Sequence, residues 1–102
     1  MNFGKMMKQV QQAQAKMAAV QEELAGETVE ASAGGGMVKV VVTGDLKVQS
    51  ITIDPAAVDP EDVEVLQDMV TAAVSEAMRS AQELMNQKMS AVTGGMNIPG
   101  LM

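Results

Sequence analysis

The sequence predicts an α+β fold of order α-β-β-β-α, in which a three-stranded antiparallel meander joins two long helices that form an arm. Two changes of hydrophobic period carry this prediction. Apolar residues recur every three or four positions, then at every second position, and then every three or four positions again. The links between the middle segments are too short for parallel crossovers, so the strands are expected to be antiparallel neighbours. The length of 102 residues fits one domain, which we place at residues 1–94.

The first helix is predicted over residues 3–24. Asn2 is a suitable N-cap and Gly26 a suitable stop. One apolar stripe with helical spacing runs along its whole length and consists of Phe3, Met6, Val10, Ala13, Met17, Val20 and Leu24. This regular stripe indicates a helix that buries one face against a partner.

Three strands are predicted after this helix, over about residues 27–33, 37–43 and 46–54. Their β-branched residues and period of two are typical of strands that are buried on one face. Gly34-Gly35-Gly36 and Gly44-Asp45 supply the two turns.

The second helix is predicted over residues 60–92, with Asp59 as N-cap and Pro60 at its first position. Such a helix is about 45 Å long, and its apolar arc is wide enough to need more than one partner surface. A second protomer is the simplest supply of that surface. The residues expected in the core or the dimer interface are Val10, Met17, Leu66, Val70 and Ala77. Residues 95–102 have too little apolar bulk to pack and are expected to form a flexible tail.

The composition argues against catalysis. The chain has no Cys and no His, which excludes disulfides, zinc fingers, thiol nucleophiles and imidazole bases. The Gly34–Gly36 run leads into a strand instead of a helix, so it is not a phosphate loop. We therefore expect no enzyme activity, no cofactor, no metal and no small-molecule substrate. No segment approaches about 18 uninterrupted apolar residues, which predicts a cytoplasmic protein without a membrane span.

Charge is distributed unevenly along the chain. Residues 1–20 hold three lysines and no acid, whereas residues 54–76 hold seven acids and no base. If the two helices pack antiparallel, their free ends gather the lysines of the first helix and Lys88 at one tip. On the first helix, one stripe beside the apolar one contains Lys5, Lys8, Gln12 and Lys16. This stripe is either a solvated face on a fraying end or a row that faces phosphates. With Phe3 as the one aromatic residue, any nucleic acid partner is expected to be duplex DNA bound through its backbone.

The order of these features resembles the YbaB/EbfC family of bacterial nucleoid-associated proteins. The matching stretches cover nearly the whole chain and are FGKMMKQVQQAQAKM, QEELA, GGGMVKVVVTGDLKVQSITIDP, VLQDMVTAAVSEAM and KMSAVTGGMNIPG. The resemblance implies a tweezers-like homodimer that binds duplex DNA in the nucleoid with little sequence preference. The DNA-binding residues that it implies here are Lys5, Lys8, Gln12, Lys16, Arg79 and Lys88. The alternative is a protein-interaction adaptor in DNA repair or recombination that associates with DNA only indirectly.

Overall fold

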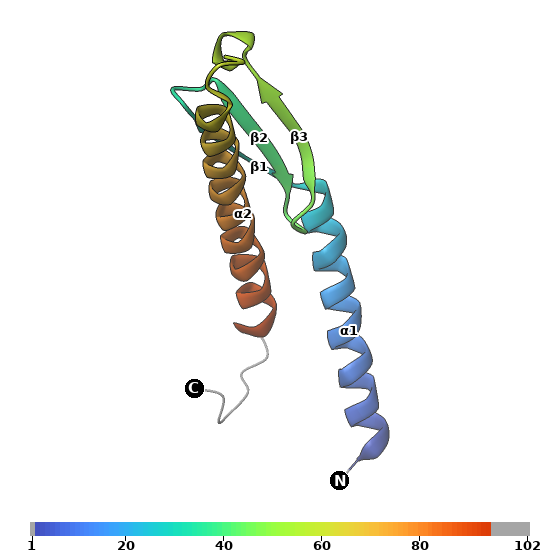
Figure 1. The fold of residues 1–102 in the computed structure, drawn as a ribbon. Coiled ribbons are helices and arrows are strands. Elements are labelled where there is room, and N and C mark those ends of the chain that lie inside the picture. Colours follow the sequence, from blue (N-terminus) through green and yellow to red (C-terminus); the bar gives the residue numbers. More distant parts are fainter. Residues whose placement is uncertain (1, 95–102) are drawn as a thin grey trace.

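The structure, a computed structural model, describes residues 2–94 and confirms the predicted order of elements (Figure 1). A helix leads into a three-stranded antiparallel sheet of order β1-β2-β3, and a second long helix follows. The elements are α1 (Phe3–Gly26), β1 (Thr28–Ala33), β2 (Val38–Thr43), β3 (Val48–Ile53), the short 3-10 helix η1 (Pro55–Ala57) and α2 (Val63–Gly94). The predicted tail, residues 95–102, lies outside the described residues.

The core lies between α2 and the first two strands of the sheet. Alanines at every fourth position of α2 let the helix approach the sheet closely, where it meets the inward-facing valines of β2. The fully buried residues of this contact are Val38, Val40, Val42, Ala73, Ala77 and Ala81. α2 packs on β1 and β2, so it covers the face of the sheet that carries the core valines over these two strands but leaves β3 largely uncovered.

The third strand carries apolar side chains that this core does not cover. Its register places Ile53 opposite Val38 and Ile51 opposite Val40, so these side chains share the face on which α2 packs. Nevertheless Val48, Ile51 and Ile53 are 37–46% exposed. We call these three residues the β3 apolar strip.

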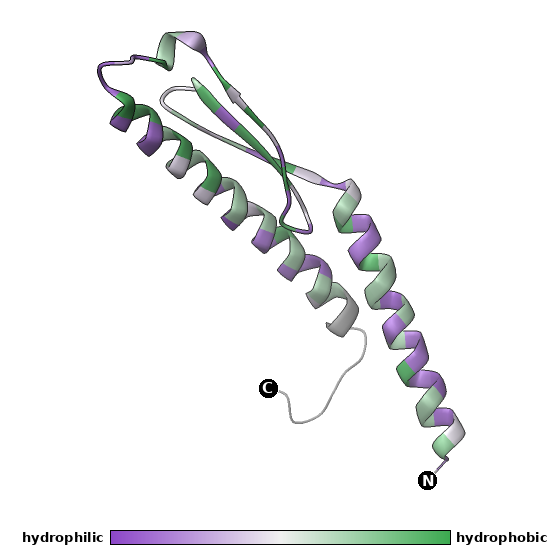
Figure 2. Ribbon diagram, turned by 45° about the vertical axis from the view of Figure 1, so that its right-hand side comes forward, coloured by the Kyte–Doolittle hydropathy of each residue, from purple (hydrophilic) through white to green (hydrophobic). Residues whose placement is uncertain are grey.

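Most of α1 extends away from the rest of the molecule. Its last turns are anchored by Val20 and Leu24, which are buried, whereas the two views show its N-terminal part projecting beyond the sheet (Figures 1 and 2). We call the part of α1 before Val20 the arm. The radius of gyration is 19.7 Å, compared with about 13 Å for a compact domain of this length. The large apolar side chains of the arm's stripe, Phe3, Met6, Val10 and Met17, are therefore 44–73% exposed.

The bounds of two elements differ from the sequence prediction. The second helix begins at Val63 instead of residue 60, because the Asp59 carboxylate accepts a hydrogen bond from the Glu61 amide (3.0 Å) and closes a turn. The third strand begins at Val48 instead of residue 46. Leu46 adopts a positive φ of 68° and donates its amide to the Thr43 carbonyl, so the turn is longer than Gly44-Asp45. The other observed bounds lie within two residues of those predicted.

We call residues 23–27, where α1 ends and joins the sheet, the root of the arm. The backbone of the turn between β2 and β3 holds this root. The Gly44 amide donates to the carbonyl oxygens of Leu24 and Glu27, each at 2.9 Å. A β-carbon at position 44 would lie 2.7 Å from the Leu24 carbonyl oxygen and 2.9 Å from its Cδ2 atom. The close approach of the turn to α1 therefore requires glycine at this position.

We expect Gly44→Ala to lower the free energy of unfolding by about 1–3 kcal/mol, because the new methyl group forces the backbone of the arm root to shift. The matched control is Gly26→Ala, where a β-carbon would meet open space. Urea unfolding at one protein concentration measures both variants. Equal midpoints for the two variants would contradict this account of the root.

Candidate nucleic-acid interface

The arm presents a row of lysines to solvent. Its members, which we call the basic row, are Lys5, Lys8, Gln12 and Lys16, and all four are exposed. Within residues 2–94, none of these lysines lies in an ion pair with a carboxylate. Their charges are therefore available to an anion from outside the chain.

The position of the basic row in α1 strengthens its positive potential. Asn2 caps the helix by accepting the Lys5 amide at Oδ1 (3.3 Å), and the first turn holds no acid. A lysine at a helix N-terminus opposes the helix dipole, at a cost of about 0.3–1 kcal/mol. The dipole and the lysines together make this end of the molecule attractive to phosphate.

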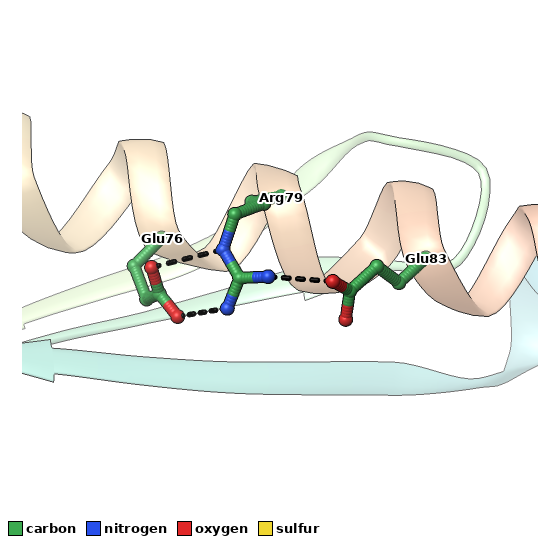
Figure 3. Close-up of polar contacts among 3 residues, drawn as sticks. All are labelled: Glu76, Arg79 and Glu83. Carbon is green, nitrogen blue, oxygen red and sulfur yellow. Dashed lines mark hydrogen bonds and ion pairs between the residues drawn. The ribbon is translucent and has the colours of Figure 1, made fainter.

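Arg79 is paired within its own helix (Figure 3). Its Nη2 lies 2.5 Å from Glu76 Oε1, its Nε lies 3.2 Å from Glu76 Oε2, and its Nη1 lies 2.6 Å from Glu83 Oε1. The hydrogen bond from Arg79, and then its charge, lower the pKa of the Glu76 carboxyl. Two carboxylates around one guanidinium leave this patch of α2 with a net negative charge. The structure thus places Arg79 apart from the basic row and already neutralised.

Lys88 lies at the root of the arm, not at its tip. Its Nζ is 2.5 Å from Glu23 Oε1 and 3.3 Å from Glu27 Oε1. Hydrogen bonds to Glu23, and then to Glu27, raise the pKa of Lys88, because both carboxylates favour its charged form. The expectation that Lys88 joins the lysines of the first helix at one tip is therefore wrong. The physical reason is that α2 first runs along β1 and β2, so that Lys88 reaches α1 at Glu23 and Glu27, where α1 joins the sheet.

The predicted core and interface residues occupy three environments. Ala77 is fully buried, and Leu66 and Val70 are partly buried against the core. Val10 and Met17 are 50% and 44% exposed in the single chain. The β3 apolar strip was not singled out from the sequence, because the alternation of a strand does not say whether a helix covers it.

Two further kinds of feature, a metal site and a membrane-spanning helix, are not found among residues 2–94. Within residues 2–94, no group of three acidic side chains is arranged to hold a metal ion. No helix among these residues is long and apolar enough to cross a bilayer.

Comparison with known proteins identifies close relatives over nearly the whole chain. The model of the YbaB/EbfC DNA-binding family matches residues 1–96. A nucleoid-associated protein of Pelotomaculum thermopropionicum is 56% identical over 98% of this chain and 95% of its own length. A nucleoid-associated protein of Moorella thermoacetica is 56% identical over 97% of this chain and 95% of its own length.

One solved structure has the same fold. It is the crystal structure of an uncharacterised protein from Helicobacter pylori, with a TM-score of 0.78 and 22% sequence identity. The match covers 91% of this chain and 96% of that one. The arrangement of an extended helix, an open sheet and a second long helix is therefore found in an experimental structure.

Proposed function

The chain belongs to the YbaB/EbfC DNA-binding family, and on that premise we propose that it binds duplex DNA in the nucleoid as a non-catalytic homodimer with little sequence preference. The observation that carries the proposal is the basic row, whose three lysines are exposed and free of ion pairs within the described residues. The names of the relatives support the nucleoid, and hence the cytoplasm, as the place where it acts.

The basic row fits the backbone of a duplex better than its bases. Lys5 and Lys16 are separated by about 16 Å along the helix, a length over which duplex DNA carries about nine phosphate charges at one per 1.7 Å. Lysines meet phosphates as point charges, and the Gln12 amide can donate a hydrogen bond between them. The row contains no arginine, the side chain whose planar fork best fits guanine, and only a single glutamine, so it offers at most one amide to the bases. Binding is therefore expected to depend little on sequence.

Two uncovered apolar surfaces support a homodimer. One is the apolar stripe of the arm, and the other is the β3 apolar strip. A second copy of the chain would cover both, and it would place two arms on one particle in the manner of tweezers. A dimer of this kind presents six lysines from its two basic rows.

The rival function is that of an adaptor that grips another protein and meets DNA only through it. The exposed apolar residues near the tip of the arm, Phe3 and Met6, favour this alternative. It differs from direct binding in one observable: it predicts no complex between the purified protein and DNA.

We expect the purified protein alone to bind a fluorescent duplex at low salt in the presence of EDTA, because phosphate contacts need neither a metal nor a nucleotide. Fluorescence anisotropy measures this directly. A complex that forms only after Mg²⁺ or ATP is added would contradict the mechanism. A complex that forms only with a second protein would favour the adaptor.

A further inference from the structure

The angle between the arm and the sheet depends on a short connection. After α1, Glu27 turns to extended backbone (φ −98°, ψ 149°) and Thr28 already pairs in the sheet. The backbone contacts with Gly44 hold this point but not the direction of the helix beyond it. The buried side chains of Val20 and Leu24 hold the last turns of α1, and an ion-pair contact between these turns and α2 further restrains the direction of the helix.

Lys88 supplies such a contact between α2 and the root of the arm. The other ion pairs of the described residues join neighbours within α2 or within the second turn. Lys88 of α2 instead pairs with Glu23 and Glu27 at the end of α1, and it lies 65 residues from Glu23 in sequence. Its side chain is only 28% exposed.

The Glu27 side chain is 38% exposed, but one oxygen of its carboxylate is buried beside this contact. Glu27 Oε2 is buried and has no hydrogen-bond partner among the described residues. A carboxylate in such a place is costly unless a cation lies nearby, and Lys88 Nζ is 3.3 Å from its other oxygen. The charge of Lys88 therefore balances the negative charges of Glu23 and Glu27, and the lysine is held in these ion pairs before DNA binds.

We propose that Lys88 is a positioning residue for DNA binding, which fixes the direction of the arm through Glu23 and Glu27 and does not itself contact phosphate. This inference rests on the proposed function. The leverage is large, because Lys5 lies about 27 Å from Glu23 along the helix. A swing of about 20° at the root would move Lys5 by about 9 Å, more than two steps of 3.4 Å between phosphates of one strand.

The binding test compares variants that remove either side of the ion pair. We expect Lys88→Gln and the double variant Glu23→Gln/Glu27→Gln to weaken duplex binding alike, by about tenfold, with the slope of log K against log salt unchanged. A phosphate contact at Lys88 predicts the opposite pattern. Lys88→Gln would then reduce the slope by about 1.8 per dimer, and removal of the acids would strengthen binding.

A charge swap and a neighbouring acid supply the controls. Lys88→Glu combined with Glu23→Lys and Glu27→Gln is expected to restore binding, because it rebuilds the pair between positions 88 and 23 in reverse and removes the Glu27 charge that would repel the new carboxylate. Glu22→Gln removes one acid next to Glu23 that is exposed and outside the ion pair, and it should not weaken binding. Stronger binding by the Glu23→Gln/Glu27→Gln variant would overturn the proposal.

A distance measurement without DNA separates this inference from the proposed function. Because the chain has no cysteine, spin labels on Gln11→Cys and Ser50→Cys report the angle between arm and sheet. Labelled chain diluted in excess unlabelled chain gives the distance within one protomer. We expect a narrow distribution that broadens with Lys88→Gln and with Glu23→Gln/Glu27→Gln, but not with Glu22→Gln. An unchanged distribution in both overturns the inference even if DNA binds, and broadening without any DNA binding overturns only the proposed function.

Discussion

Ile51→Asp is expected to convert the proposed dimer into folded monomers, with a rise of at least about 100-fold in the dimer dissociation constant. Ile51 is 46% exposed in the single chain and lies on the face of the sheet where α2 packs. Covering the exposed 46% of Ile51 contributes about 0.7–1.4 kcal/mol, and a symmetric interface loses that contribution twice. The new carboxylate would also be buried without a partner. Light scattering after gel filtration measures the mass of the particle.

The control for this variant lies on the same strand. Thr52→Asp places the same charge on the opposite, polar face of β3, where the register sets it across from Lys39. It should leave the dimer intact. A wild-type monomer at micromolar concentration, or an Ile51→Asp protein that remains dimeric, would rule out an interface at the β3 apolar strip.

Lys5→Gln combined with Lys8→Gln should weaken binding to every duplex, by on the order of 100-fold near physiological salt, because a dimer then loses up to four phosphate contacts. The loss should be the same for unrelated sequences, since these lysines do not read bases. Titration of each duplex at one fixed salt concentration measures the effect.

The matched control removes two lysines from the sheet end of the molecule. Lys39 and Lys47 are exposed, and Lys47 lies 3.8 Å from the Asp45 carboxylate. Their replacement by glutamine changes the net charge by the same amount but should alter binding little. If the Lys5→Gln/Lys8→Gln protein binds as the wild type does, the contact surface lies elsewhere and the adaptor is favoured.

The order of elements could be predicted because each period of apolar residues is local. The stripe of α1 and the β-branched run of β2 needed no knowledge of tertiary contacts. The start of α2 was misjudged because Asp59 can cap either a helix or a turn, and the turn prevails here. The uncovered strip on β3 was also missed, because it follows from a single helix packing on two strands out of three.

For the candidate site too, contacts within one helix could be predicted from the sequence and contacts between helices could not. Positions of residues within one helix follow from its geometry, so the basic row could be recognised from spacing alone. The ion pairs of Arg79 were missed, although the sequence holds a signal for them, since Glu76 and Glu83 stand three residues before it and four after it. The ion pair of Lys88 with Glu23 could not be predicted from the sequence, because it depends on how α2 is placed relative to α1 in the folded chain.

The most direct test of the central claim is the salt dependence of wild-type binding to two unrelated duplexes of equal length. With Arg79 and Lys88 engaged in ion pairs, six arm lysines remain per dimer, so the slope of log K against log salt should be no steeper than about −5. Both duplexes should give the same slope and affinities within about tenfold of each other. A slope near zero, or strong protection of one sequence alone, would contradict binding through the phosphates.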